Sequence, residues 1–218
     1  MELLAKGLYI VSTPIGNLDD ISLRAIRVLS KSDIILCEDT RHSRNLLDHL
    51  NIKRKLISYH KFNEKKVVNN IIKHLNEGKI LSLISDAGTP TISDPGNILV
   101  NECIKHNIDI FSIPGASSVI SAMSVSGFEQ KFIFYGFLPK KENELIKILK
   151  NLSNLDFSLI FFSPSNKINF YLEHFKIYMK DRKIMIAREL TKKYETIYRN
   201  EVDNIKFFKT NLKGELTI

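Results

Sequence analysis

Short apolar segments alternate along the chain with segments whose apolar residues recur at helical spacing. The first kind is rich in β-branched residues and predicts strands at residues 7–12, 34–37, 56–59, 80–84 and 108–113. The second kind predicts helices at residues 21–29, 41–50, 67–75 and 96–106, and Asp20 is positioned to cap the first of them. This repeated order predicts a mostly parallel, open sheet covered by helices.

The pattern changes at Pro114-Gly115, which interrupts the alternation and opens a helix through Met123. Beyond it, strands are predicted at residues 132–135, 159–162, 183–187, 196–198 and 215–218, with helices at 145–152 and 168–178. We therefore predict an α/β protein with two α/β domains, residues 1–114 and 115–218. The sheet of the second domain is expected to be more mixed than that of the first.

Charge is concentrated in the C-terminal part of the chain. Residues 1–130 contain 15 basic and 14 acidic side chains, whereas residues 131–218 contain 17 basic and 10 acidic ones, a net charge of +7. A basic excess of this kind favours a polyanionic partner such as nucleic acid. A composition rich in Lys, Ile and Asn produces the same bias without any partner, so charge alone leaves both interpretations open.

Composition excludes several other classes of protein. With 44% hydrophobic and 26% charged residues, the chain is not expected to be disordered. The apolar runs are strand-sized, well short of the roughly 20 residues that a membrane-spanning helix needs, and the N-terminus lacks a secretory signal pattern. Cys37 and Cys103 cannot form a disulfide framework. We expect a cytoplasmic protein without a membrane partner.

Polar loops follow each predicted strand of the first domain. Ligands of parallel α/β sheets bind beyond the carboxyl ends of the strands, so these loops are expected to converge on one site. The loops are Thr13-Pro14-Ile15-Gly16-Asn17, Glu38-Asp39-Thr40-Arg41, His60-Lys61-Phe62-Asn63-Glu64, Ser85-Asp86-Ala87-Gly88-Thr89-Pro90 and Pro114-Gly115-Ala116-Ser117-Ser118. Each alone is explained by an ordinary turn. Neither the dinucleotide fingerprint nor the P-loop is present, and the His residues show no metal-ligand spacing, so no metal is predicted.

The second domain repeats this arrangement twice. Phe161-Phe162-Ser163-Pro164-Ser165 follows one predicted strand, and Arg188-Glu189-Leu190-Thr191-Lys192-Lys193 follows another. The second of these segments contains cations and a carboxylate directly beyond a strand end. A solvated charged turn also accounts for it.

The ordered set of motifs resembles a known family. It comprises Ser12-Thr13-Pro14-Ile15-Gly16-Asn17-Leu18, Cys37-Glu38-Asp39-Thr40-Arg41, Ser85-Asp86-Ala87-Gly88-Thr89-Pro90, Ser93-Asp94-Pro95-Gly96, Pro114-Gly115-Ala116-Ser117-Ser118 and Ala187-Arg188-Glu189-Leu190-Thr191-Lys192. Together these segments resemble the bacterial 16S rRNA (cytidine-2′-O)-methyltransferases, a family of the tetrapyrrole (corrin/porphyrin) methylase superfamily. The resemblance implies two α/β domains with S-adenosylmethionine (SAM) in the cleft between them, a homodimer, and methylation of a cytidine ribose in the decoding region of 16S rRNA in the small ribosomal subunit.

The resemblance also implies roles for particular residues. By motif position, the cofactor contacts are Pro14, Ser85, Asp86, Ala87, Gly88, Ala116, Ser117, Phe162, Ser163, Ala187 and Gly214. A ribose hydroxyl is a poor nucleophile at neutral pH, so a base or an electrostatic stabiliser of the alkoxide is expected. The candidates for this catalytic role are Asp39, His60, Glu189 and Lys192, and Arg41 and Arg188 suit phosphate contacts. No metal is required.

Two features depart from the family pattern. Phe62 stands where family members commonly have a second His, and the chain ends at Ile218 where relatives continue, so the second domain is expected to be truncated relative to the family. Two alternatives stay open. One is a methylase of the same superfamily acting on a tetrapyrrole or other small molecule, which the charge disfavours. The other is a non-enzymatic RNA-binding protein, which the intact Asp86 and Gly88 loop disfavours.

Overall fold

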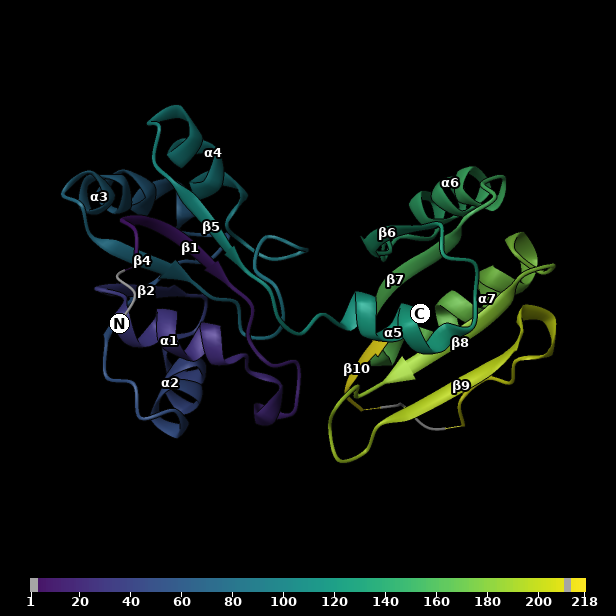
Figure 1. The fold of residues 1–218 in the computed structure, drawn as a ribbon. Coiled ribbons are helices and arrows are strands. Elements are labelled where there is room, and N and C mark those ends of the chain that lie inside the picture. The colour runs from purple at the N-terminus through teal and green to yellow at the C-terminus, as the bar shows by residue number, and fades with distance from the viewer. Residues whose placement is uncertain (1–3, 210–212) are drawn as a thin grey trace. The chain divides into compact units, whose positions relative to one another are not determined.

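The computed structural model describes residues 4–209 and 213–218 and divides the chain into two compact units, residues 1–117 and 118–218 (Figure 1). The division falls three residues beyond the boundary predicted between residues 114 and 115. The turn at Pro114 belongs to the first unit because it packs against it: a Cβ atom on Gly115 would lie 2.9 Å from Cβ of Ser12. The Thr89 hydroxyl also donates a hydrogen bond to the carbonyl oxygen of Ala116, at 3.3 Å.

The first unit contains one parallel sheet of five strands. They are β1 (Gly7–Val11), β2 (Ile34–Cys37), β3 (Lys55–Ser58), β4 (Ile80–Leu83) and β5 (Ile110–Ile113). Their order is β3-β2-β4-β1-β5, and every neighbouring pair is parallel. All four residues of β2 are buried, as expected for a strand covered on both faces. The predicted fold class of the first unit is confirmed.

Helices cover both faces of this sheet. They are α1 (Leu23–Lys31), α2 (Thr40–His49), α3 (Glu64–Asn76) and α4 (Asn97–Lys105). Ile35 and Cys37 lie in the core with α1 and α2, whereas Ile34 and Leu36 lie in the core with α3 and α4 (Figure 1). Successive side chains of a strand point to opposite faces of the sheet. The apolar residues of β2 therefore contribute alternately to the core on each face.

The second unit contains a mixed sheet of five strands. They are β6 (Phe132–Phe137), β7 (Ser158–Pro164), β8 (Lys183–Arg188), β9 (Thr196–Glu201) and β10 (Glu215–Thr217). Their order is β6-β7-β10-β8-β9; β6 and β7 are parallel, and the other neighbours are antiparallel. The prediction of a mixed second sheet is confirmed.

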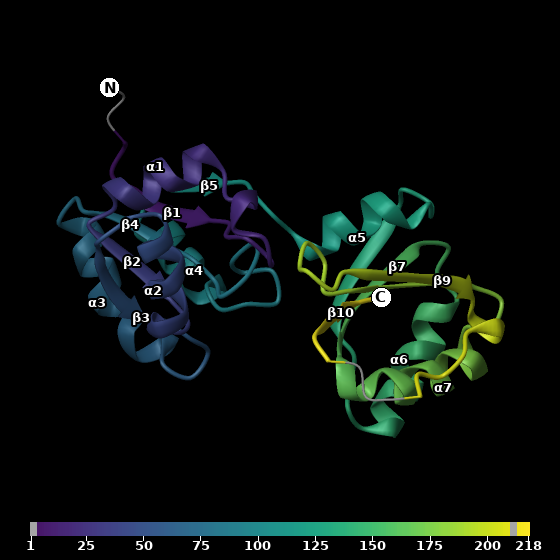
Figure 2. The same cartoon turned by 90° about the horizontal axis from the view of Figure 1, so that it is seen from below.

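The helices of the second unit lie on opposite faces of its sheet. α6 (Glu142–Ser153) and α7 (Ile168–Tyr178) form the apolar core with one face, and α5 (Ser118–Ser126) lies on the other (Figure 2). Three short 3₁₀ helices, η1 (Leu18–Asp20), η2 (Ser165–Lys167) and η3 (Val202–Asn204), complete the described elements and were not predicted. No helix among residues 4–209 and 213–218 is long and apolar enough to cross a membrane.

The predicted capping of α1 by Asp20 is wrong. Asp20 ends η1, and the Ser22 hydroxyl caps α1 by accepting a hydrogen bond from the backbone N–H of Ala25, at 3.0 Å. Serine is as good an N-cap as aspartate, and Ser22 directly precedes the first helical residue.

Candidate functional site

The five loops after the strands of the first unit lie at one edge of its sheet. This follows from the parallel pairing of all neighbours in the order β3-β2-β4-β1-β5. Across the edge, the His60 loop comes first, followed by the segment after β2, the Asp86 loop, the Pro14 loop and the turn at Ala116. The five loops therefore share one edge of the sheet, as the predicted parallel pairing requires.

Three of these loops are joined by hydrogen bonds into one group. The backbones of Thr13 and Gly88 exchange two N–H···O bonds, at 2.8 and 3.1 Å. The Thr13 hydroxyl donates to the carbonyl oxygen of Ser85 at 3.2 Å, and the hydroxyls of Ser12 and Thr89 lie 2.9 Å apart. Thr89 in turn donates to Ala116. We call residues 12–15, 85–89 and 114–117 the interlocked loops; they contain Pro14, Ser85, Asp86, Ala87, Gly88, Ala116 and Ser117.

Gly88 has a backbone conformation that requires glycine. Its φ is +78°, in the left-handed region that side chains rarely adopt. A Cβ atom there would lie 3.3 Å from Cγ2 of Ile15 and 3.7 Å from the carbonyl oxygen of Ala116. The glycine therefore lets the interlocked loops approach one another.

The Asp86 loop is also held from β2 and α2. The backbone N–H of Asp39 donates to Oδ1 of Asp86 at 3.3 Å, and Nε2 of His42 donates to the Asp86 carbonyl oxygen at 3.1 Å. The Glu38 carboxylate accepts a hydrogen bond from the backbone N–H of Asp86. Sequence reasoning missed His42 as part of the site. The sequence does contain a signal for this role, because His42 lies in the first turn of α2, three residues after Asp39.

Asp39 and Arg41 form an ion pair at the start of α2. The Asp39 carboxylate caps the helix by accepting the N–H of Arg41 at 2.8 Å, and Nη2 of Arg41 lies 2.8 Å from Oδ2 of Asp39. These bonds hold the pKa of Asp39 well below its usual range. The carboxylate is consequently ionised and a weak proton acceptor. The Arg41 side chain is 90% exposed, so it can contact an anion in solution.

Glu38, next to Asp39, has the opposite electrostatic environment. Burial of its carboxyl group, with the negative charges of Asp94 and Asp86 nearby, raises the pKa of Glu38 to about 7. The Glu38 carboxyl group, which lies at this edge of the sheet, therefore changes its charge near neutral pH. The sequence placed Glu38 in the loop but did not distinguish it from Asp39, because burial depends on the packing of distant residues.

His60 is positioned by its own loop at the edge strand. Its Nδ1 accepts a hydrogen bond from the backbone N–H of Phe62 at 3.2 Å, and its backbone N–H donates to Oδ1 of Asn63 at 2.8 Å. The Phe62 side chain is 80% exposed and its ring contacts the His60 ring edge-on. Nδ1 is thus an acceptor, so the proton of the neutral ring is on Nε2.

The charged residues after β8 form a compact cluster in the second unit. Nζ of Lys192 lies 3.1 Å from Oε1 of Glu189 and 2.8 Å from Oε2 of Glu215. Burial alone would lower the pKa of Lys192, but the hydrogen bonds to both carboxylates outweigh it and raise that pKa. Burial would likewise raise the pKa of Glu189, but hydrogen bonds from the Glu215 backbone and Lys192 lower it. Both side chains are therefore charged.

Gly214 packs directly against this cluster. Its φ is +101°, and a Cβ atom there would overlap the carboxyl group of Glu189. The Glu189 carboxylate also accepts a hydrogen bond from the backbone N–H of Glu215, at 3.0 Å. Glycine at this position thus allows the Glu189 carboxylate to lie against the start of β10.

The remaining predicted residues of the second unit meet in two rows of the sheet. Phe162 pairs with Thr217, which pairs with Ala187, and Ser163 pairs with Leu216, which pairs with Arg188. β10 therefore joins the ends of β7 and β8. Nε of Arg188 donates to the carbonyl oxygen of Lys213 at 2.8 Å, within the same part of the unit.

Within residues 4–209 and 213–218, no group of three or more His, Cys, Asp or Glu side chains is arranged to hold a metal ion.

Comparison with known proteins identifies the family. A profile of the tetrapyrrole (corrin/porphyrin) methylases matches residues 7–206. The chain is 48% identical over 217 residues to the ribosomal RNA small subunit methyltransferase I of Mesomycoplasma conjunctivae, covering 99% of this chain and 91% of that protein. It is 46% identical over 219 residues to the protein of the same name from Rickettsia prowazekii, covering 99% of this chain and 78% of that protein.

A solved structure shares the fold at low sequence identity. The uroporphyrin-III C-methyltransferase of Thermus thermophilus, complexed with S-adenyl homocysteine, aligns with a TM-score of 0.67 at 12% identity, covering 97% of this chain and 95% of that one. The chain belongs to the tetrapyrrole (corrin/porphyrin) methylase family, and it is a methyltransferase. The resemblance found in the motifs is confirmed.

The environment of Glu38 predicts a pH-dependent stability. The pKa of Glu38 is about 7 in the folded protein and has its ordinary value of 4.5 in the unfolded chain. As the pH rises, the unfolded chain therefore loses this proton first. The free energy of unfolding consequently falls as the pH rises from 4.5 to about 7. Glu38→Gln keeps a hydrogen-bond acceptor but carries no charge. We expect the variant to have a higher Tm than the wild type at about pH 8, with a difference that shrinks as pH is lowered. Thermal unfolding across the window measures this, and parallel Tm curves would contradict it.

Proposed function

We propose that this protein transfers the methyl group of SAM to the 2′-hydroxyl of a cytidine in the decoding region of 16S rRNA, in the small ribosomal subunit. The observation that carries the proposal is the interlocked loops at one sheet edge, in a chain that is 48% identical to a ribosomal RNA small subunit methyltransferase I. The substrate implies a cytoplasmic location. The family resemblance further implies a homodimer.

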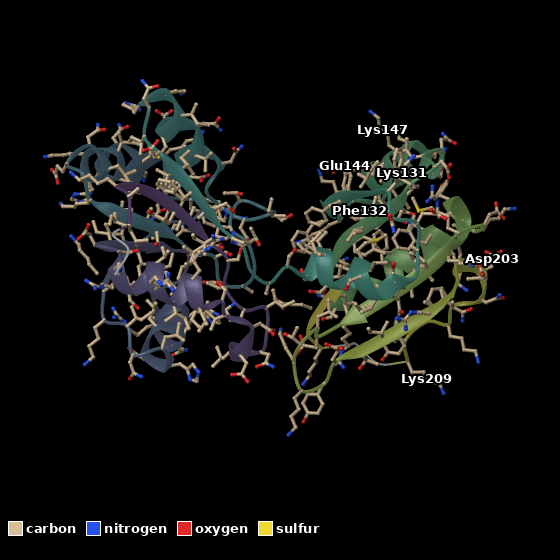
Figure 3. All side chains as sticks on the ribbon, in the orientation of Figure 1. Lys131, Phe132, Glu144, Lys147, Asp203 and Lys209 are labelled. Carbon is tan, nitrogen blue, oxygen red and sulfur yellow. The ribbon has the colours of Figure 1, made fainter. Side chains whose placement is uncertain are left out.

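The basic surface of the second unit supports an RNA substrate. Residues 118–218 contain 17 basic and 11 acidic side chains, against 15 and 13 in residues 1–117. Exposed lysines project from several parts of this unit, among them Lys131 just before β6, Lys147 on α6 and Lys209 after η3 (Figure 3). Such a surface attracts phosphate groups in any sequence context, whereas a tetrapyrrole offers only its few carboxylates.

We assign cofactor binding in the first unit to the interlocked loops. Thr13 and Gly88 hold the loops together through their backbones, so the loops are preorganised before a ligand arrives. Pro14, Ser85, Asp86, Ala87, Gly88, Ala116 and Ser117 are the proposed contacts there, and Phe162, Ser163, Ala187 and Gly214 are those in the second unit. SAM, when bound, supplies a methyl group activated by a positively charged sulfur.

The environments of the proposed catalytic residues suggest a division of roles. Lys192 is cationic and suits electrostatic stabilisation of a developing alkoxide, and Glu189 holds its ammonium group in place. Asp39 is engaged with Arg41 and the start of α2, which suits positioning of the Asp86 loop better than proton transfer. His60 stays a candidate for the proton acceptor, a role that requires its Nδ1 to release the backbone N–H of Phe62. Arg41 and Arg188 remain proposed phosphate contacts.

A labelling experiment tests the function directly. Labelled SAM is incubated with the protein and either undermethylated small ribosomal subunits or a tetrapyrrole. We expect label in 16S rRNA, recovered as 2′-O-methylcytidine after nuclease digestion. Label in the tetrapyrrole would support the small-molecule alternative. RNA binding without any transfer would support the non-enzymatic alternative.

The assignment of the interlocked loops predicts that Gly88→Val weakens SAM binding by roughly tenfold or more. A β-branched residue at this φ is strained, and its side chain contacts Ile15 and the Ala116 backbone. Gly127→Val is the matched control, because Gly127 has a φ of +72° but no atom within 4 Å of an added Cβ. Titration calorimetry measures both variants. Equal SAM affinity in the Gly88 variant and the control would remove the loop from the cofactor site.

The charge of Lys192 predicts a loss of rate without a loss of cofactor affinity. We expect Lys192→Ala to lower kcat for methylation by roughly 10²-fold, the usual scale for a positioned electrostatic group. SAM affinity should barely change, since the interaction acts on the transition state. Lys192→Arg keeps the charge and should recover part of the rate. If Lys192→Ala methylates at the wild-type rate, or loses SAM instead, the proposed role is wrong.

A further inference from the structure

The turn between β8 and β9 carries an exposed aromatic side chain beside the charged cluster. Tyr194 is 65% exposed, although aromatic residues usually bury their large apolar surface. It lies two residues after Lys192, whose ammonium group is held by Glu189 and Glu215. Tyr194 therefore stands on the same turn as a residue proposed to act on the substrate hydroxyl.

The turn that carries Tyr194 is tightly hydrogen-bonded. The Tyr194 carbonyl oxygen accepts bonds from Nη1 of Arg188 at 3.3 Å and from the Thr196 hydroxyl at 3.1 Å. The backbone N–H of Lys192 donates to the Glu189 carbonyl oxygen at 3.0 Å, and that of Glu195 to the Lys192 carbonyl oxygen at 3.0 Å. The aromatic ring thus projects from a supported backbone rather than from a loose loop.

Two residues of the turn have strained backbones. Glu189 has a φ of +53° and Thr191 a φ of +65°, although neither is glycine. Strain of this kind persists where the surrounding structure imposes it, and it is common at ligand-binding segments. Both residues lie in the segment in which the Lys192 N–H bonds back to the Glu189 carbonyl oxygen, directly before Tyr194.

A cation accompanies the exposed ring. Nζ of Lys193 lies 5.7 Å from the centroid of the Tyr194 ring. An exposed aromatic face next to lysine is the arrangement with which proteins bind single-stranded nucleic acid: a base stacks on the ring and the cation contacts the backbone phosphate. The net positive charge of residues 118–218, with 17 basic and 11 acidic side chains, complements that ligand.

We propose that Tyr194, with Lys193, forms a stacking platform for an unpaired base of the RNA substrate, next to the nucleotide that is methylated. This proposal rests on the proposed function and adds to it the way in which the substrate is held. Stacking requires a base that is not paired, so the platform selects single-stranded RNA over duplex. It acts on the binding of RNA and not on the binding of SAM.

The experiment compares Tyr194→Ala, Tyr194→Phe and Phe207→Ala with the wild type. Phe207 is the matched control, because it is 50% exposed with Nζ of Lys176 at 5.4 Å from its ring, but it lies after η3 and not on the turn. Four quantities are measured: KM for undermethylated small subunits, kcat, the Kd for SAM, and the Kd for a single-stranded RNA oligonucleotide containing one 2-aminopurine. Quenching of 2-aminopurine fluorescence reports stacking.

We expect Tyr194→Ala to raise KM and the oligonucleotide Kd by roughly 5- to 100-fold, the effect of removing one base–aromatic stack, and to lose the quenching. Tyr194→Phe should keep all three near the wild-type values, because the ring and not the hydroxyl stacks. The SAM affinity should not change, and Phe207→Ala should behave like the wild type. Duplex RNA of the same sequence should bind the wild type more weakly.

Unchanged RNA binding and quenching in Tyr194→Ala would overturn the platform while leaving the proposed function intact. An equal loss in Phe207→Ala would also overturn it, since the effect would then belong to any exposed ring. Failure of the wild type to label RNA would count against the proposed function instead, and the oligonucleotide measurement would still decide the platform.

Discussion

Parallel pairing of the first five strands is the constraint on which the first unit depends. It buries the sheet on both faces, and it places all five loops after the strands at one edge. The bridge between Thr13 and Gly88 then joins the loops of β1 and β4, and Thr89 extends the connection to the turn after β5. The proposed cofactor site is in this sense a consequence of strand order.

The start of α2 shows how neighbouring carboxylates acquire different properties. Asp39 faces Arg41 and the backbone N–H groups of the helix, which keep it ionised. Glu38 is one residue earlier, at the end of a buried strand, where burial and two nearby carboxylates disfavour its charge. The difference arises from strand direction and packing, since adjacent residues of an extended chain point to opposite sides.

In the second unit, the position of β10 in the sheet determines the surroundings of the charged cluster. β10 is the central strand of its sheet and pairs with both β7 and β8. This pairing brings Glu215 next to Glu189 and Lys192. The turn after β8 is consequently supported from two strands. A supported turn can keep a lysine among carboxylates and present an aromatic ring to solvent, so the proposed electrostatic and stacking roles depend on the same hydrogen bonds.

The hydrophobic pattern by itself determined the strands, the helices and the two-unit α/β organisation, because burial on one or both faces imposes a period that is visible in the residues. The ordered motifs also determined the family. The pattern determined the element boundaries less well. Ser22, and not Asp20, caps α1, since either side chain can cap and only the local backbone selects one.

Only the tertiary structure decided which partners and charges the candidate site residues have. The sequence offered Asp39, His60, Glu189 and Lys192 as candidates. In the structure Arg41 holds Asp39 in its ionised form, and Glu215 pairs with Lys192. Glu215 is separated from Lys192 by 23 residues, and no local pattern predicts that they meet. Contacts between distant segments set the raised pKa of Glu38, the pairing of Lys192 with Glu215 and the holding of Asp86 by His42. Those contacts exist only after the strands have paired, which is why the pattern of residues along the chain could predict the loops but not their chemistry.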